Sequence, residues 1–400
     1  MESFDDSKNN TDNNTLASNE INNGSTFSVY FLDYCSKLNI FVTILITLIG
    51  LVGHSLTVQV YSQRRFRLNS GSVFLLSLSI VDALFLIIHF FEDTVRTIND
   101  SYSNQLNWVL NSIVIRINIV DHNDFVCRIA NYFRNIFRLQ SAYIIVAFTL
   151  QRLFIVYKPL SNEFKTKKSA WRTLFVILIF SLLINIWAPF LFKINYVDTH
   201  SYCDVDRDWV NEYLTINAIY MCLVMLVPIL IIFVCNTLII VKTVQDDLRR
   251  KKYKNVKSLT KCNNNNNKST STLLKASVKQ AQRYRFGREN KNLVNSNNKK
   301  IICNQSNSKK MTKTLLLVSF SYAILNLPYL ISWSLFYTQM MASIIEPTFK
   351  NNLFSALQIS EMFNILNYGC HFFVYCLSGT LFRNQLKYTL SRRVKSTSSF

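Results

Sequence analysis

Seven apolar segments, each long enough to cross a lipid bilayer as a helix, constrain the fold of this 400-residue chain more than any other feature of its sequence. A helix crosses the ~30 Å hydrocarbon core in ~20 residues. Only 7 glycines and 5 prolines occur, which suits long helices. We therefore predict an all-α membrane protein built as a bundle of seven transmembrane helices. The predicted spans are Leu38–Tyr61, Val73–Glu92, Cys127–Tyr157, Trp171–Phe192, Tyr213–Val241, Thr314–Met340 and Leu353–Leu377.

Lysine and arginine gather in alternate connections between the spans, and this sets the predicted orientation of the bundle. The segment 242–313 alone carries twenty Lys and Arg residues against three acidic ones. Because positively charged loops stay in the cytoplasm, this segment is expected inside and the N-terminus outside, in the plasma membrane. A net charge of +21 in a soluble protein would indicate nucleic-acid binding. Here membrane topology explains the charge, so lipid is an expected partner and nucleic acid is not.

The same pattern divides the chain into five parts. Residues 1–37 form an extracellular N-terminus, 38–241 the first five helices, and 314–378 the last two. The Asn- and Lys-rich segment 242–313 is predicted to be a disordered cytoplasmic loop. In 379–400 a short amphipathic helix is predicted to lie on the membrane surface before a tail. Glycosylation sequons on the outer side begin at Asn9, Asn13, Asn23 and Asn99.

The sequence does not indicate an enzyme, because it has no nucleophile–base pair, metal-ligand cluster or phosphate-binding loop. Its nine cysteines are scattered without CxxC pairs or histidine companions, which argues against a zinc site. We expect no cofactor. A seven-span transporter or channel is an alternative from another class, but the inverted repeats and paired Gly/Pro breaks of transporters are missing.

Several short motifs stand at defined places in the spans. They are Leu78 to Asp82, Cys127, Gln151-Arg152, Pro228, Asn326-Leu327-Pro328, and His371 to Tyr375 followed by Phe382-Arg383. In order and spacing they resemble the landmarks of the rhodopsin-like (class A) G-protein-coupled receptors, over about residues 38–390. This resemblance implies a divergent receptor that binds an extracellular ligand and signals to a heterotrimeric G protein.

The resemblance also implies roles for residues at the two ends of the third span. Cys127 at its outer end would form a disulfide bond with Cys203. Arg152 at its inner end would reach the G protein in the active state, and Tyr375 of the same machinery is retained. The family locks this arginine to a preceding carboxylate, but here the preceding residue is Gln151, which cannot form a charged pair. We therefore expect raised basal activity.

Asp82 is a carboxylate inside the second span, where a charge costs ~3 kcal/mol or more and so indicates function. The family holds a sodium ion at this position, and this is the one metal site that we expect. His54 and His371 stand where the family usually has asparagine. Either they donate hydrogen bonds as neutral imidazoles, or one imidazolium pairs with Asp82 and displaces sodium. The other residues assigned to this buried polar site are Ser141, Asn326 and Asn367.

Charged residues in the outer half of the bundle predict the ligand site. Arg134 stands where amine receptors carry Asp, which disfavours an amine, and Ile365 stands where opsins carry the retinal-binding Lys. Arg134 and Arg138 are four residues apart and share a helix face. They either pair internally, Arg134 with Glu361 or Glu92, or bind a ligand carboxylate or carbonyl. The resemblance adds three cavity-lining aromatic residues, Tyr220, Tyr329 and Trp333.

The outer surface favours a neuropeptide as the ligand. The connection between the second and third spans is long, and residues 114–120 partly alternate between polar and apolar, which predicts a strand or hairpin over the mouth of the bundle. A large polar surface with a wide charged cavity fits a peptide better than a small lipid. The alternative is a small anionic metabolite or lipid anchored by Arg134 and Arg138.

Overall fold

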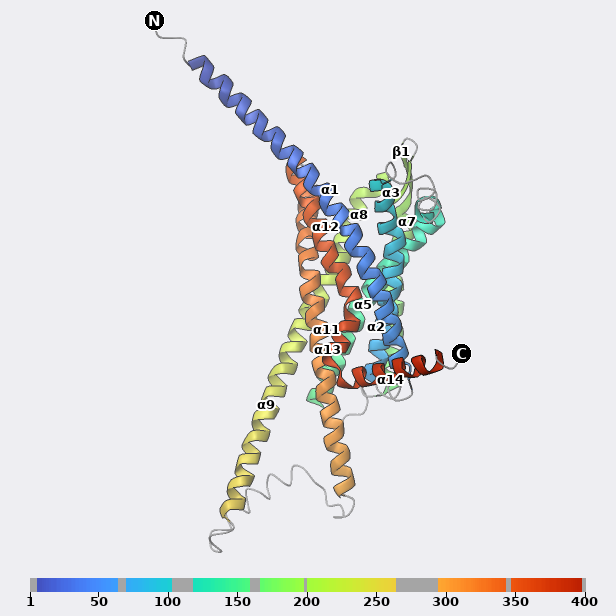
Figure 1. The fold of residues 1–400 in the computed structure, drawn as a ribbon, viewed down its shortest axis with the longest axis vertical. Coiled ribbons are helices and arrows are strands. Elements are labelled where there is room, and N and C mark those ends of the chain that lie inside the picture. Colours follow the sequence, from blue (N-terminus) through green and yellow to red (C-terminus); the bar gives the residue numbers. More distant parts are fainter. Residues whose placement is uncertain are drawn as a thin grey trace.

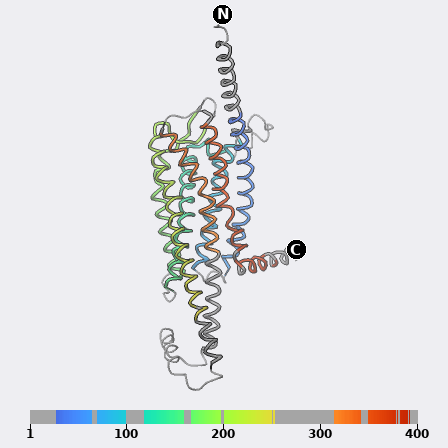
Figure 2. The backbone as a smooth tube through the Cα atoms, turned by 90° about the vertical axis from the view of Figure 1, so that its left-hand side faces the viewer, coloured from blue at the N-terminus to red at the C-terminus, as the bar shows by residue number. Residues whose placement is uncertain are grey.

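The computed structural model describes residues 6–63, 70–102, 118–158, 166–197, 200–263, 294–342 and 347–397. Long helices lie side by side in a bundle, which confirms the predicted all-α fold (Figures 1 and 2). Within the described chain, six stretches are long and apolar enough to cross a membrane: Phe27–Tyr61, Ser70–Ile98, Asp124–Tyr157, Lys167–Leu191, Arg207–Arg249 and Thr314–Met341. The seventh predicted span corresponds to α12 (Pro347–Gly369) and α13 (His371–Ser378), and α12 packs against α1 and α11.

Two π-helical turns, η1 (Phe90–Thr94) and η5 (Cys222–Leu226), interrupt the second and fifth spans. A π turn takes an extra residue into the helix and so changes which side chains face the bundle. The other elements are α1 (Asp6–Tyr61), α2 (Ser70–His89), α3 (Val95–Tyr102), η2 (Ile119–Asp121), α5 (Asp124–Tyr157), α6 (Lys167–Ile184), α7 (Ala188–Leu191), β1 (Phe192–Val197), β2 (His200–Val205), η4 (Arg207–Trp209), α8 (Val210–Met221), α9 (Val227–Asn263), α11 (Val294–Ala342) and α14 (Thr380–Thr397).

Several helices extend beyond the predicted spans. The first helix begins at Asp6, well before the predicted apolar span. In segment 242–313, which was expected to lack regular structure, α9 continues to Asn263 and α11 begins at Val294. The lysines and arginines near the end of α9 favour this continuation, because cations stabilise the C-terminal end of a helix dipole. Residues 264–293 lie outside the described chain.

A two-stranded hairpin covers part of the end of the bundle that the sequence predicts to face outside, which is called the outer end below; the opposite end is called the inner end (Figure 1). Strands β1 and β2 pair antiparallel, with Ile194 opposite Cys203. The hairpin therefore lies between the fourth and fifth spans, whereas the sequence predicted a strand or hairpin over 114–120. Most of that segment lies outside the described residues, and Ile119–Asp121 just after it is the 3-10 turn η2.

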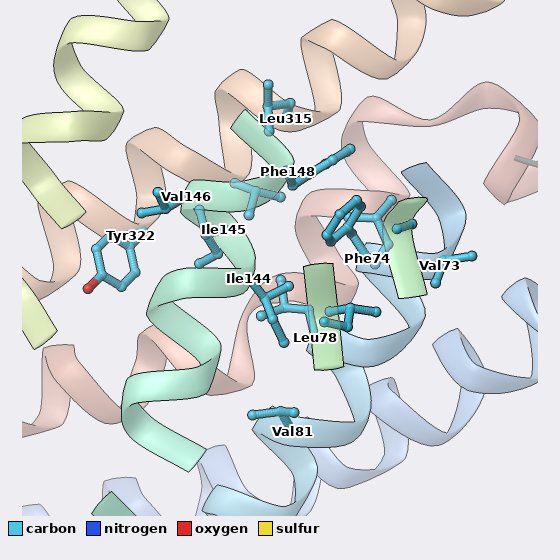
Figure 3. Packing of buried hydrophobic residues seen from close by; sticks show 14 of the residues in the cluster. Val73, Phe74, Leu78, Val81, Ile144, Ile145, Val146, Phe148, Leu315 and Tyr322 are labelled. Atoms are coloured by element: carbon cyan, nitrogen blue, oxygen red, sulfur yellow. The ribbon is translucent and has the colours of Figure 1, made fainter. Parts of the chain in front are cut away.

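The apolar core of the inner half forms around α5, which contacts α2, α6, α9 and α11. Figure 3 shows Phe74 of α2 beside Phe148 of α5, and their ring centroids are 6.0 Å apart. Tyr322 of α11 lies at the edge of this core, and its hydroxyl donates a 2.6 Å hydrogen bond to the carbonyl of Val224 in η5. The π turn leaves a carbonyl open to such a donor, so the tyrosine fastens the sixth span to the fifth.

Helix α14 runs across the inner end of the bundle, as predicted for a surface helix (Figure 1). Phe382 is buried against the rings of Tyr61 and Tyr375. The Gln63 side chain at the end of α1 donates a 2.7 Å hydrogen bond to the Thr389 hydroxyl. Gln385 in turn donates a hydrogen bond to the Gln63 side-chain oxygen. An apolar face and polar contacts to Gln63 therefore hold α14 against the first and last spans.

Candidate functional site

The outer rim is organised around the Cys127–Cys203 disulfide bond, which joins the start of α5 to β2 with 5.6 Å between the Cα atoms. Asp121 of η2 lies beside it and is nearly fully buried. Its Oδ1 accepts hydrogen bonds from the backbone N–H of Cys203 at 2.8 Å and from Arg96 Nη2 at 2.9 Å. The Asn118 amide reaches its other oxygen at 2.8 Å. Asp121 thus ties the second span to the hairpin, a role that the sequence analysis missed.

Charged contacts also anchor the hairpin along its other edge. Lys193 Nζ of β1 lies 2.5 Å from Asp206 Oδ2, just before η4. This ammonium group holds the pKa of the Asp206 carboxyl below its usual value. Asp124 Oδ1 accepts the backbone N–H of Ile194 at 3.2 Å, while its Oδ2 pairs with Arg128 at 2.8 Å. The hairpin is therefore a fixed part of the outer mouth.

Below the rim, Glu92 of η1 and Arg134 of α5 form an ion pair with Nη1 3.1 Å from Oε1. The Glu92 side chain is 3% exposed and that of Arg134 is 21% exposed. A second nitrogen of Arg134 donates to the Asn131 side chain at 3.0 Å. Of the two partners considered for Arg134, the structure brings Glu92 into contact. The arginine is positioned by its neighbours and still reaches solvent.

Arg138 lies one turn deeper on α5 and is almost completely buried. Its guanidinium carbon is 5.6 Å from the centroid of the Phe85 ring, a cation–π contact. Around it lie the other residues assigned to the ligand site, Tyr220, Tyr329 and Glu361, together with Tyr368. Trp333 and Tyr329 pack against the apolar cluster that contains Tyr220, whose hydroxyl donates to the Asn135 carbonyl at 2.8 Å. The seven residues predicted for the ligand site therefore gather at one end of the bundle.

A second buried polar group surrounds Asp82 in the middle of α2. The Ser141 hydroxyl donates to Asp82 Oδ1 at 2.6 Å, and His371 Nδ1 lies 2.7 Å from Oδ2. His371 and Asp82 therefore share a hydrogen bond between the seventh and second spans. His54 does not reach Asp82, since its Nε2 lies 2.8 Å from the Tyr368 carbonyl oxygen. Both carboxylate oxygens of Asp82 are thus already engaged by protein side chains, so this arrangement does not fit sodium coordination.

Two asparagines complete the assigned polar site. Asn326 donates to the Tyr322 carbonyl at 2.7 Å, within its own helix. Both polar atoms of the buried Asn367 amide, and His371 Nε2, have no hydrogen-bond partner among the described residues. These atoms leave polar capacity beside Asp82 that the described protein groups do not use.

At the inner end of α5, Gln151 and Arg152 are both buried. Gln151 Nε2 donates to the Ser70 hydroxyl at 3.1 Å and so connects the third span to the start of the second. The Arg152 guanidinium lies over the Phe148 ring, 5.2 Å from its centroid. Tyr375 is completely buried, with its ring edge-on to Tyr61 at 5.9 Å. Aromatic rings and a neutral hydroxyl are therefore among the contacts that position Gln151, Arg152 and Tyr375.

The sequons Asn9, Asn13 and Asn23 fall in α1 and Asn99 falls in α3, but their side chains are not among those that the structure describes. Sequence reasoning also passed over His89 at the end of α2. Its i, i+4 spacing to Asp93 could have indicated a pair of ionisable side chains, because these positions share one face of a helix.

Two comparisons with known proteins bear on this arrangement. The sequence profile of the 7 transmembrane receptor (rhodopsin family) matches residues 55–370. The chain is also 22% identical over 170 residues to cephalotocin receptor 1 of Octopus vulgaris. That similarity covers 42% of this chain and 38% of the octopus protein.

Proposed function

Because this chain belongs to the rhodopsin family of seven-transmembrane receptors, we propose that it binds an extracellular peptide and signals to a heterotrimeric G protein across the plasma membrane. The distant octopus relative is, by its name, a receptor for cephalotocin. The N-terminus would lie outside and the Lys-rich segment after α9 inside, in keeping with the positive-inside rule.

The Glu92–Arg134 pair is the observation that carries the ligand proposal. Arg134 presents a guanidinium group that is partly exposed, already oriented by Glu92 and Asn131, and near Tyr220 and Tyr329. A guanidinium group binds a carboxylate through two parallel hydrogen bonds. A ligand carboxylate or amide carbonyl would take the place of Glu92 on Arg134, while Tyr329 and Trp333 would pack against its apolar part.

The outer rim supports a peptide rather than a small molecule. The disulfide, the Asp121 contacts and the Lys193–Asp206 pair fix the hairpin beside the mouth of the bundle, so the mouth presents a broad surface of fixed shape. A peptide has enough length to contact both this surface and Arg134 below it. A small anionic metabolite would need only Arg134 and Arg138, and this is the competing proposal.

The ligand test uses cells that express the receptor with a promiscuous G protein, screened with a peptide library and a library of organic acids. We expect a peptide to evoke the response. Arg134→Ala should weaken its potency by at least about tenfold, since one lost charge-assisted contact costs ~1.5–3 kcal/mol. Arg134→Lys keeps the positive charge but cannot form the bidentate pair of hydrogen bonds, so it should retain only part of the potency.

Surface expression of each variant is measured in parallel, so that lost folding is not mistaken for lost binding. A response to acids alone would favour the metabolite receptor. A peptide whose potency is the same for the parent and both Arg134 variants would refute the assigned site. Arg152→Ala should abolish signalling while leaving peptide binding in place, and retained signalling would refute the role of Arg152.

A further inference from the structure

A third group of ionisable side chains meets at the outer end of the second span. It joins Glu361 of the predicted ligand site to His89 and Asp93, which neither the ligand proposal nor the Asp82 cluster uses. His89 ends α2, Asp93 follows in η1, and Glu361 comes from α12. One candidate ligand atom from each residue lies within 4.8 Å of the corresponding atoms of the other two. The group therefore connects the second and seventh transmembrane spans.

His89 is the member that most needs an explanation. Its side chain is 1% exposed, and neither ring nitrogen has a hydrogen-bond partner among the described residues. Its Nε2 faces Asp93 Oδ2 at 3.9 Å, which is too long for a hydrogen bond. Stacking on Phe85, with 5.7 Å between centroids and 3° between planes, fixes the ring in this direction. A buried polar group without a partner is costly, so a ligand is expected here.

The charges around His89 favour a cation as that ligand. The neighbouring Arg96–Asp121 pair is neutral in itself. Three carboxylates then face two guanidinium groups, and the Glu92–Arg134 contact accounts for one of each. The two remaining carboxylates lie close together, and they cannot both carry a charge without a further cation, because Arg138 balances only one of them. The three acids are Glu92, Asp93 and Glu361, and the two bases are Arg134 and Arg138.

We propose that His89, Asp93 and Glu361 bind a zinc ion that fastens the outer end of the second span to α12. One imidazole nitrogen and two carboxylate oxygens suit zinc, and a water molecule would complete its tetrahedron. At metal–ligand distances of 2.0–2.2 Å, the ligand atoms of a tetrahedral zinc lie about 3.3 Å apart. The widest gap in the group therefore closes by up to about 1.5 Å through side-chain rotation. Asp93, which is 35% exposed, gives the hydrated ion a route in.

The first test is a zinc titration of the purified, metal-stripped full-length receptor in detergent, with no peptide or G protein present. We expect about one zinc ion per chain and an apparent melting temperature that rises to a plateau, because an ion that binds only the folded state stabilises it. Magnesium at the same concentrations should have no such effect, since it prefers six oxygen ligands.

Variants locate the ion. His89→Gln, Asp93→Asn and Glu361→Gln should each weaken zinc binding by more than about tenfold, because even the loss of an outer-shell partner costs 10–100-fold. Glu361→His keeps a ligand atom and should bind zinc within about tenfold of the parent. The matched controls are His122→Gln and Asp124→Asn, which change the same residue types at exposed positions of the outer face and should bind zinc as the parent does.

An unchanged melting temperature of the parent in 1 mM zinc would overturn the proposal. The proposal would also fail if the three site variants bound zinc as tightly as the parent, because the ion would then be an adventitious ion only. If a variant does not fold, cobalt binding to the parent receptor replaces the variant as the test of the site. Tetrahedral cobalt absorbs visible light, and the absence of a band that zinc displaces would also overturn the assignment. All these readouts are independent of the ligand and of signalling.

Discussion

The Glu92–Arg134 ion pair offers a quantitative test of how the outer site is held together. The two charges are 3.1 Å apart, with Glu92 3% and Arg134 21% exposed. At an effective dielectric constant of ~20, this separation corresponds to an attraction of about 5 kcal/mol. Desolvation of both groups opposes it. Because Arg134 keeps contact with solvent, we expect a net coupling free energy of about 2–3 kcal/mol between the two side chains.

The perturbation is a double-mutant cycle of Glu92→Gln, Arg134→Gln and the combined variant. Each single change leaves a buried charge without its partner, whereas the double change removes both charges. Each single variant should lower the apparent melting temperature by about 4–12 °C, at 2–4 °C per kcal/mol. The double variant should lose much less than the sum of the two. Melting is followed in detergent with a chelator present, so that zinc makes no contribution.

Asp33→Asn is the matched control, because it breaks an ion pair with Lys37 in which both side chains are 41–55% exposed. An exposed pair of this kind contributes at most about 1 kcal/mol, so its melting temperature should barely move. If the two single changes at the buried pair add within about 0.5 kcal/mol in the double variant, the residues are not coupled. The claim that Glu92 orients Arg134 would then be refuted.

Three further changes test the inner half of the bundle. Gln151→Glu gives Arg152 a charge-assisted bond worth ~1–3 kcal/mol, so ligand-free signalling should fall about tenfold at matched surface expression; an unchanged basal signal would mean that other contacts hold the resting state. His371→Asn removes the imidazole ring that contacts Asp82 and supplies an amide oxygen, so ligand affinity should become sodium-sensitive; an identical sodium response in parent and variant contradicts this. Gly53→Ala places a Cβ 2.7 Å from Phe372 Cβ, so overpacking should destabilise the receptor by about 1–3 kcal/mol, measured as a lower melting temperature; equal melting would show that α13 moves aside without cost.

Much of the architecture could be predicted from the sequence, because the bilayer imposes a local rule. Each span needs ~20 consecutive apolar residues, and that requirement can be read without knowing any neighbour. The predicted bundle, the crosswise C-terminal helix and the Cys127–Cys203 bond are all present in the structure. The disulfide came from the resemblance, which places a cysteine at the start of the third span. Helix ends were harder to predict, because α1, α9 and α11 continue beyond their apolar parts.

Only the tertiary structure decided which polar groups meet. The sequence left Glu92 and Glu361 as rival partners of Arg134, and it placed both His54 and His371 beside Asp82. The structure pairs Arg134 with Glu92 and Asp82 with His371. Such choices depend on the rotation and depth of each helix in the bundle, and η1 changes that rotation at Glu92 itself.

The same reason explains why the His89 group could not be predicted. His89 and Asp93 are one helical turn apart, but Glu361 is brought to them only by the packing of α12 against the second span. Apolar content, charge balance and motif spacing are properties of the chain and determined the spans and their predicted orientation. Contacts between side chains of different helices are properties of the packed bundle, because many weak interactions set each helix's position together.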